Sequence, residues 1–439
     1  MRNLSIRRAD DEGSRFRSNL PLLRSSLSLS ISAGTASVGG FVYWLVVAHI
    51  ASADTVGKAA ALYSSINFVN YVTGLGLPIA VARYGGGRER NPSILFNWSV
   101  VGTVVSSVLG TAIYFAIIPH QLHALTVLTV AGSIVILGLI SAGMSVGSVL
   151  DVRLISQHRR TWVVGRSIVI GVIRLPFLLI HGLGHSTIGL FMIAVGAPAV
   201  CGFGAWVIAD LGDRHFSFPL RPLPPNTRSA VQYAIVNGVG QLGVQAPSFA
   251  LPVIVLLLVP PKANASFYVV WTIAVVVFLI VQSVGQALLV EGNRSGQLDH
   301  QVRASLKFGV LLSVGLAAAC VIGSKLLPAL YGSSYTSGAR VLPLLGVAAI
   351  PWTVFTVVLS ATRVRHNHRR NLSLSLLFAV SVLAPAAILV DKFGIDGAAE
   401  AWLFGNVVTA LASLIVLRQI RKSPSTDASP PVVLPPTAI

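Results

Sequence analysis

The sequence is poor in charge and in cysteine. Only 10% of its 439 residues are Asp, Glu, Lys or Arg, and 14 of these are acidic. Soluble globular domains carry about 25% charged residues, so this composition excludes an ordinary soluble domain. The two cysteines, Cys201 and Cys320, lie in different apolar runs, where a free cysteine behaves as a small hydrophobic residue. This usage argues against a disulfide framework and against a cysteine-rich metal site.

The chain also lacks a nucleotide-binding signature. It contains no Walker A sequence and no glycine-rich phosphate loop after a strand. We therefore expect no ATP hydrolysis by this chain alone. We also expect no cofactor, no metal and no enzymatic activity.

What the sequence does contain is a succession of long apolar runs. Hydrophobic residues make up 54% of the chain, and the mean hydropathy is +0.77. A bilayer core of about 30 Å is crossed by a helix of roughly 20 apolar residues, and in lipid the backbone polar groups have to be satisfied within the segment. The runs predict twelve transmembrane helices over residues 26–50, 58–82, 93–118, 125–150, 163–184, 187–209, 230–258, 265–290, 305–328, 341–362, 372–391 and 397–417.

The basic residues between these runs fall on alternate connections. Of the 32 Lys and Arg residues, 26 lie in or within four residues of the two terminal segments and every second connection, 5 lie in or within four residues of the other connections, and Arg174 alone lies deep within a run. Because cytoplasmic loops carry an excess of Lys and Arg, this distribution predicts a multi-pass protein of the cell membrane with both termini in the cytoplasm. It also accounts for the net charge of +18 without a clustered basic face, so we expect no nucleic-acid partner.

The twelve runs form two sets of six. A shift of 209 residues superposes Gly57 on Ser266 and Gly76 on Gly285, which indicates an internal duplication. Both sets begin on the same side, so we predict an all-α integral membrane fold of two six-helix lobes related by a pseudo-two-fold axis along the membrane normal. Transporters built in this way place the substrate path between the lobes.

The predicted organisation has five parts. They are a basic cytoplasmic arm over 1–25, an N-terminal six-helix lobe over 26–210, a cytoplasmic linker over 211–229, a C-terminal six-helix lobe over 230–417 and a disordered cytoplasmic tail over 418–439.

Polar side chains share helical faces within three of the predicted helices. The positions are spaced by three or four residues and comprise Asn67, Asn70, Tyr71, Asn237, Gln241, Gln245, Gln282 and Gln286. Such side chains face a bundle interior or a cavity, because exposure to lipid is costly. Two interpretations remain open: hydrogen bonds between helices, worth on average about 0.6 kcal/mol each, or a hydrated substrate cavity. Their recurrence on corresponding helices of both halves favours the cavity.

Three charged residues are candidates for functional roles. Arg174 lies well inside a predicted helix, where a cation normally has a partner or a ligand, so an anionic substrate group is one interpretation and pairing or snorkelling is the other. Arg83, at the inner end of the second helix, is a weaker candidate at the cytoplasmic opening. Glu400, early in the last helix, is a weak candidate for coupling transport to an ion.

Three stretches carry a resemblance to a known family. Val56-Gly57 through Gly74-Leu75-Gly76 to Arg83 is the first. The second runs from Leu330-Tyr331-Gly332 through Tyr335 and Gly338-Ala339 to Leu342-Pro343-Leu344-Leu345, and the third is Gly394-Ile395-Asp396-Gly397-Ala398-Ala399. Together with the twelve-helix plan, their order and spacing resemble the polysaccharide-transporter branch of the multidrug/oligosaccharidyl-lipid/polysaccharide (MOP) flippase superfamily, which includes the O-antigen and capsule repeat-unit flippases.

This resemblance implies a flippase that carries a polyprenyl-pyrophosphate-linked oligosaccharide across the cytoplasmic membrane during cell-surface polysaccharide synthesis. Arg174 or Arg83 would contact the pyrophosphate, and the Asn, Gln and Tyr side chains would contact the sugars. The implied partners are the lipid-linked saccharide, membrane lipids, a polysaccharide polymerase and glycosyltransferases. The alternatives within the superfamily are a cation-coupled multidrug exporter and a peptidoglycan-precursor flippase. The alternative of another class is a membrane glycosyltransferase or polymerase.

Overall fold

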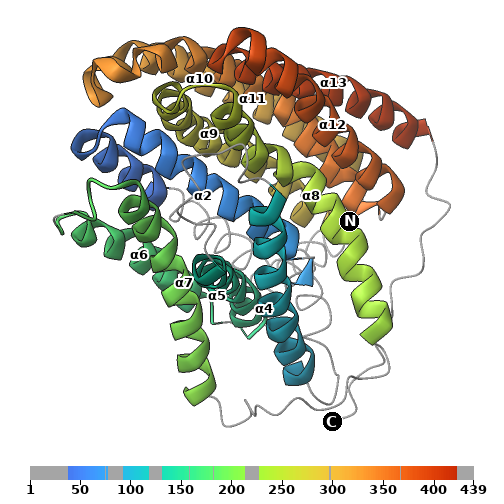
Figure 1. The fold of residues 1–439 in the computed structure, drawn as a ribbon. Helices are drawn as coiled ribbons and strands as arrows, with labels where there is room; N and C mark the ends of the chain where they lie inside the picture. Colours follow the sequence, from blue (N-terminus) through green and yellow to red (C-terminus); the bar gives the residue numbers. More distant parts are fainter. Residues whose placement is uncertain are drawn as a thin grey trace, which may run out of the picture.

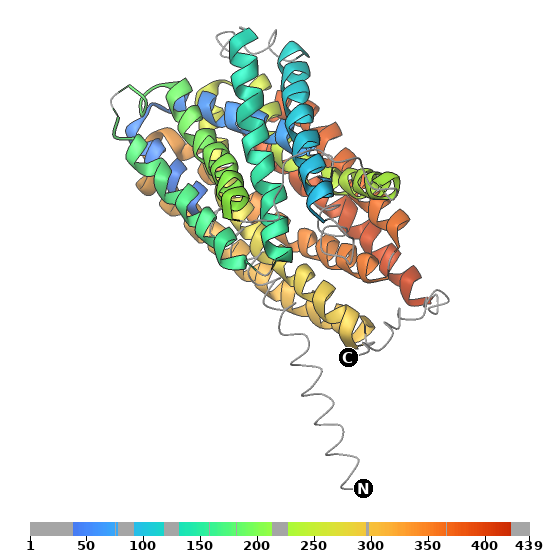
Figure 2. The ribbon, with the colours of Figure 1, turned by 90° about the horizontal axis from the view of Figure 1, so that it is seen from below.

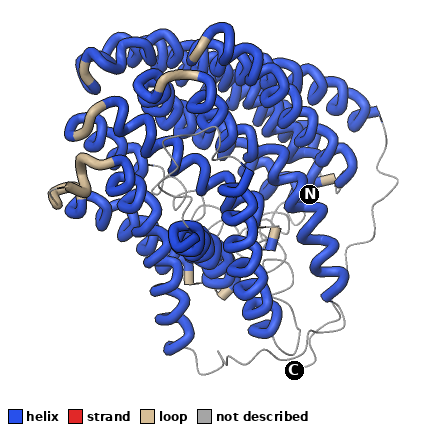
Figure 3. The backbone as a smooth tube through the Cα atoms, viewed as in Figure 1, coloured by secondary structure: helices blue, strands red, loops and turns tan. Residues whose placement is uncertain are grey.

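The structure is a computed structural model that describes residues 38–74, 76–77, 92–117, 131–157, 159–180, 182–212, 227–295, 298–365 and 367–422. Within these ranges the chain forms twelve α-helices and one short 3₁₀-helix, without strands (Figure 3). The helices are Val38–Ile50, α2 (Ala53–Thr73), α4 (Pro92–Ile117), α5 (Ala131–Ser156), α6 (Arg160–Phe177), α7 (Thr187–Gly212), α8 (Thr227–Leu258), α9 (Pro261–Ser295), α10 (Leu298–Tyr331), α11 (Thr336–Val364), α12 (His368–Phe393) and α13 (Ile395–Lys422), with the 3₁₀-helix η3 at Ser333–Tyr335.

Every predicted transmembrane segment overlaps one of these helices, and parts of several segments lie outside the described residues. Nine of the helices in the described ranges are long and apolar enough to cross a membrane, which confirms an all-α, multi-pass membrane fold. The remaining three are the helix Val38–Ile50, α2 and α6. The first is described over 13 residues only, and the 18 residues of α6 include three arginines. Most of the predicted arm, linker and tail lies outside the described residues.

The helices form two groups of six, which are called here the N lobe (Val38–Ile50, α2 and α4–α7) and the C lobe (α8–α13). In the N lobe α5 packs on α4 and α7, and in the C lobe α11 packs on α9, α10 and α13 while α12 packs on α8 and α13. Figure 1 shows the C-lobe helices layered along one side of the molecule and α4–α7 along the other. Seen from below, the α4–α7 helices lie in front of the blue helices (Figure 2), and α2 contacts helices of both groups.

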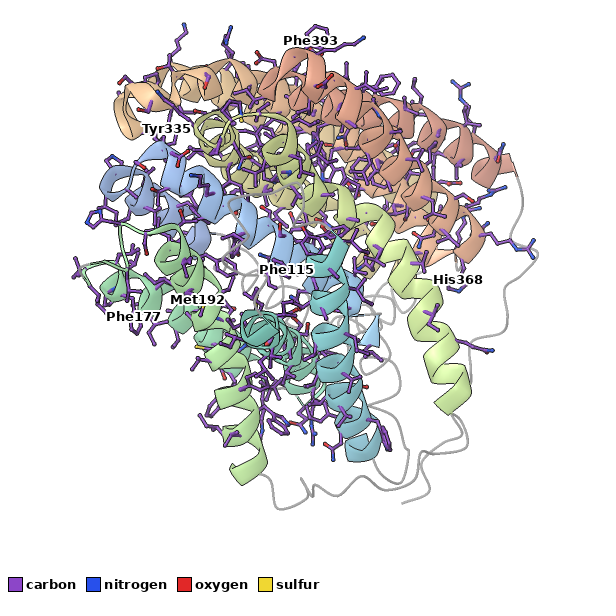
Figure 4. The ribbon with its side chains drawn as sticks, viewed as in Figure 1. Phe115, Phe177, Met192, Tyr335, His368 and Phe393 are labelled. Atoms are coloured by element: carbon purple, nitrogen blue, oxygen red, sulfur yellow. The ribbon has the colours of Figure 1, made fainter. Side chains whose placement is uncertain are left out.

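The outer surface of both groups is apolar. Leu311 is 73% exposed, and Phe177 and Phe393 are also exposed and point away from the bundle (Figure 4). Soluble proteins rarely expose large contiguous apolar patches, and this coat is the one expected of helices surrounded by lipid.

Contact between the lobes is carried largely by α2, which packs on α8 and α9. The amino-terminal ends of α2 and α9 meet with almost no space between them. A Cβ atom at Gly57 would lie 1.9 Å from the carbonyl oxygen of Pro261, and the buried Asn264 donates from Nδ2 to the carbonyl oxygen of Gly57 at 2.9 Å. Only glycine permits this approach. These two helices are the ones that the 209-residue shift relates to each other.

Candidate functional site: two cavities between the lobes

A cavity of about 390 Å³ lies between the N lobe and the C lobe. Four of the polar residues predicted to face a cavity line it: Asn67, Tyr71, Gln245 and Gln282. The helix Val38–Ile50, α2, α8, α9, α11 and α13 all contribute side chains, so the cavity depends on how the two lobes meet. The amide groups of its wall can donate and accept hydrogen bonds, and they suit a neutral polar ligand.

Aromatic rings form much of the remaining wall of this cavity. From the N lobe come Trp44 and Tyr63, and from the C lobe Tyr268, Trp271 and Trp402, together with Phe278 and Trp352. The indole of Trp44 packs edge-on against Tyr268 across the lobe boundary, with ring centroids 4.9 Å apart. Rings beside amides form a surface on which a flat, partly apolar ligand can lie while its polar edge is hydrogen-bonded.

A second cavity, of about 290 Å³, adjoins the first and shares Tyr71 with it. Its wall includes Asn70 on α2, Gln241 on α8, and Ser145 and Ser148 on α5. Tyr71 packs on Phe249 of α8, with ring centroids 5.3 Å apart, at the junction of the two cavities. The polar faces predicted for α2 and α8 therefore lie toward the lobe boundary, with hydroxyl groups of α5 that the sequence analysis did not single out.

Hydrogen bonds within the N lobe fix the orientation of the α2 amides. Ser145 Oγ donates to Asn70 Oδ1, and Ser107 Oγ lies 3.5 Å from Ser145 Oγ. The Asn67 side chain instead bonds to its own helix, donating from Nδ2 to the carbonyl oxygen of Tyr63 at 2.7 Å. The α2 amides are thus held in place from within the N lobe.

A cation that directly follows the predicted helix 341–362 lies beside the second cavity. Arg363, in the last turn of α11, is half-buried and donates from Nη2 to Gln241 Oε1 and from Nε to Asn371 Oδ1, each at 3.4 Å. These bonds are long. Among the described residues its partners are neutral amides, so its charge stays available to an anion.

Sequence patterns gave no means of selecting Arg363. It belongs to a cluster with Arg365, Arg369 and Arg370, and the positive-inside rule accounts for all four equally well. The structure separates them because α11 continues to Val364. The guanidinium of Arg365 lies 3.6 Å from a carboxylate oxygen of Asp299 instead.

The other predicted site residues lie elsewhere. Gln286 is exposed on α9 and Glu400 is exposed on α13, and neither lines the two cavities. Arg83 lies outside the described residues, and so does the side chain of Asn237. Neither cavity is lined by Asp or Glu within the described part of the chain.

Arg174 occupies a different environment from the one predicted. The predicted helix 163–184 ends earlier, at Phe177, so Arg174 lies in the last turn of α6 rather than deep inside a span. It is nevertheless only 5% exposed, and its guanidinium carbon lies 5.9 Å from the ring centroid of Tyr43. A cation near a helix carboxyl terminus and over an aromatic face is stabilised by both. Arg174 does not line either cavity, and its contact with a substrate stays a prediction.

Comparisons with known proteins define the fold. No family model and no curated protein sequence matches the chain. Solved structures do match it. One, an inward-facing conformation of a multidrug resistance MATE family transporter of the MOP superfamily, superposes with a TM-score of 0.70 at 14% identity, over 90% of this chain and 98% of its own.

An outward-facing conformation of a multidrug resistance MATE family transporter gives a TM-score of 0.62 at 14% identity, over 92% of this chain and 96% of that one. A third structure is a MOP superfamily transporter from Pyrococcus furiosus, for which the reverse polarity of the binding pocket is said to suggest a different function. It gives a TM-score of 0.61 at 14% identity, over 91% of this chain and 95% of its own. The chain has the fold of the MATE transporters. These identities establish the fold alone, and the score is higher for the inward-facing conformation than for the outward-facing one.

Proposed function

We propose that this protein translocates a polyprenyl-pyrophosphate-linked oligosaccharide across the membrane by alternating access between its two lobes. One observation supports this above the others. The interlobe cavities are lined by amides, hydroxyls and aromatic rings, Arg363 lies beside them, and no described lining residue is a carboxylate. A wall of this kind suits a neutral sugar that carries an anionic group.

Each part of such a substrate has a chemical counterpart at the lobe boundary. Sugar hydroxyls exchange hydrogen bonds with side chains such as Gln245 and Gln282, and sugar rings lie on the faces of aromatic residues such as Trp271. Arg363 offers a guanidinium to a phosphate oxygen, a charge-assisted contact that is roughly twice as strong as a neutral hydrogen bond. The polyprenyl chain stays in the lipid beside the lobes.

Alternating access requires the contact between α2 and α9 to open and close. In the predicted orientation, the ends of these helices that meet at Gly57 are the outer ends. The closed contact between Gly57, Pro261 and Asn264 then corresponds to a state shut on the outer side. The superposition scores for inward- and outward-facing transporters agree with that assignment.

Multidrug export is the second candidate, and the aromatic wall favours it. Organic cations bind well over the faces of Trp and Tyr rings, several of which line the larger cavity. A cation-coupled exporter would also need carboxylates to bind the drug or the coupling ion. The described lining residues provide none, and the positive charge of Arg363 repels a cation.

A flipping assay with purified protein tests the proposal. Proteoliposomes without nucleotide would receive a fluorescent polyprenyl-pyrophosphate oligosaccharide, and a membrane-impermeant quencher would measure transfer between leaflets. We expect transfer that Gln282→Leu reduces roughly tenfold, because the cavity loses an amide that the sugar cannot replace. Gln286→Leu, one turn along α9 and exposed, is the matched control and keeps most of the activity. Efflux of organic cations without any lipid transfer would replace this proposal with multidrug export.

A further inference from the structure

A groove of about 670 Å³ runs along the lipid-facing side of the N lobe, separate from the two interlobe cavities. It lies between α6 and α7, with Leu154 of α5 at its base. Figure 1 shows these two helices side by side at the edge of the N lobe that faces away from the C lobe. No residue of the groove lines either interlobe cavity, so the transport proposed above does not account for the groove.

Small residues open the groove. Gly165 of α6, and Cys201, Gly204 and Ala205 of α7, all line it. A Cβ atom added at Gly165 or Gly204 would meet nothing within 4 Å. By contrast, α7 packs tightly against α5 on its other side, where the added Cβ of Gly202 would lie 1.9 Å from a backbone oxygen. The space beside α6 is therefore a local property of that helix pair.

The walls of the groove are apolar and exposed. Trp162 and Val169 of α6 are 58% and 50% exposed, and Val200 and Ile208 of α7 are 72% and 57% exposed. From Arg159 to Val169 the groove extends about 15 Å at the rise of roughly 1.5 Å per residue. That length is about half the thickness of a bilayer core, so the groove covers one leaflet.

Positive charge and an interfacial tryptophan mark one end of the groove. Arg159 and Arg166 both line it, with Thr161 and Trp162 between them. Two bonds tie the guanidinium of Arg166 to the carboxylate of Asp151 on α5, which neutralises its charge and fixes its position. Arg159 is exposed and has no carboxylate partner in the described part of the chain, so this end carries net positive charge. Trp and Arg are typical of the level of lipid headgroups.

We infer that the groove binds a membrane phospholipid with an anionic headgroup. The phosphate and headgroup lie at Arg159 and Thr161, and one acyl chain extends along the groove toward Val169 and Val200. An anionic lipid is favoured over a zwitterionic one because a basic residue near the surface contributes about 1 kcal/mol to its binding. In the predicted orientation this end of α6 is cytoplasmic, so the lipid comes from the inner leaflet.

Native mass spectrometry of the full-length protein, titrated with phosphatidylglycerol or phosphatidylcholine, tests the inference. Wild-type protein should retain phosphatidylglycerol about fivefold more tightly than phosphatidylcholine, and Arg159→Gln should remove that preference. Gly204→Leu fills the groove and should abolish tight binding of either lipid. The matched control is Gly196→Leu on the same helix, where an added Cβ also meets nothing but which lies outside the groove.

Three outcomes would overturn the inference. Undiminished lipid binding by Gly204→Leu would place the lipid elsewhere; a loss of binding supports the groove because the melting temperature of this variant is compared with that of Gly196→Leu. Equal binding of the two lipids by the wild type would remove the role of Arg159. Displacement of phosphatidylglycerol by a polyprenyl phosphate, but not by phosphatidylcholine, would make the groove a substrate-tail site instead. None of these readouts depends on transport, so they stand apart from the proposed function.

Discussion

The two lobes share a helical plan but differ in what holds their helices together. In the N lobe, hydroxyl groups connect neighbouring helices: Ser106 Oγ donates to the carbonyl oxygen of Thr73 at 2.8 Å, and Ser107 lies between Thr73 and Ser145. These contacts join α2, α4 and α5. In the C lobe, the comparable hydroxyls bond chiefly to their own helix, as Thr409 does to the carbonyl oxygen of Gly405 at 2.7 Å.

Aromatic rings take the place of these hydroxyl contacts in the C lobe. Trp402 of α13 is 1% exposed and packs against Trp271 of α9 with ring centroids 4.8 Å apart. The ring centroids of Phe278 and Phe378 each lie 5.4 Å from that of Trp402, and Phe355 stacks on Phe378. Rings supply large contact areas in specific geometries, whereas hydroxyl contacts in membranes are individually weak.

The two lobes therefore contribute different groups to the cavity walls. The ring cluster joins α9, α11, α12 and α13, and its Trp402 and Trp271 also form part of the cavity wall. The hydroxyl contacts of the N lobe end at Asn70 and Ser145, which line the second cavity. The C lobe thus provides the cavity with a wall of closely packed rings, and the N lobe provides it with hydrogen-bonding groups held in place by neighbouring helices.

Removing the centre of the ring cluster should have the largest effect on stability. Trp402→Ala leaves a void among Trp271, Phe278 and Phe378 and should lower the free energy of unfolding by about 3–5 kcal/mol. The change would be measured by unfolding the protein in detergent. Trp402→Phe keeps a ring and should cost clearly less. A cost of under 1 kcal/mol for the alanine variant would show that the ring cluster contributes little to the stability of the C lobe.

Blocking the contact between the lobes should stop transport without unfolding either lobe. Gly57→Val places side-chain atoms against the backbone of Pro261, so the closed contact with α9 cannot form. We expect the flipping rate to fall at least tenfold while each lobe keeps its packing. Gly315→Val on α10, where an added Cβ meets nothing, controls for the loss of a helical glycine. Normal flipping by Gly57→Val would show that this contact does not have to close during transport.

The cation beside the second cavity should determine affinity for an anionic substrate. Arg363→Gln removes the charge but keeps a hydrogen-bonding group near Gln241, and we expect roughly tenfold weaker binding of the lipid-linked saccharide, measured as a rise in half-saturating concentration. Arg363→Lys should recover part of the affinity. Arg369→Gln, an exposed arginine on the next helix, should behave as wild type. Equal effects at both positions would assign Arg363 to the general positive charge of the inner side.

Sequence alone predicted the twelve helices because hydropathy and the alternation of basic loops depend on the bilayer, which acts on every segment in the same way. The polar faces of α2 and α8 were also predictable, since spacings of three and four place Asn67, Asn70 and Gln241 on shared faces. What could not be predicted depends on how helices meet. Ser145 of α5, which contacts Asn70, shares a helical face with Ser141 and Ser148, but serine is frequent in this helix and its hydroxyl can instead bond to its own backbone, so the spacing alone did not mark a site. Arg363 could not be told from its neighbours, and the place of Arg174 depended on where α6 ends.

The smallest expected effect concerns the hydroxyl contacts of the N lobe. A double-mutant cycle of Ser107→Ala and Ser145→Ala should give a coupling energy of about 0.6 kcal/mol, because the two oxygens lie 3.5 Å apart and lipid-embedded hydrogen bonds average that value. Ser145→Ala should still slow flipping severalfold, since Asn70 loses the hydroxyl that orients it toward the second cavity. Ser107→Ala, which lines neither cavity, should leave the rate nearly unchanged. A coupling energy near 3 kcal/mol would mean that hydroxyls hold the N lobe as firmly as rings hold the C lobe.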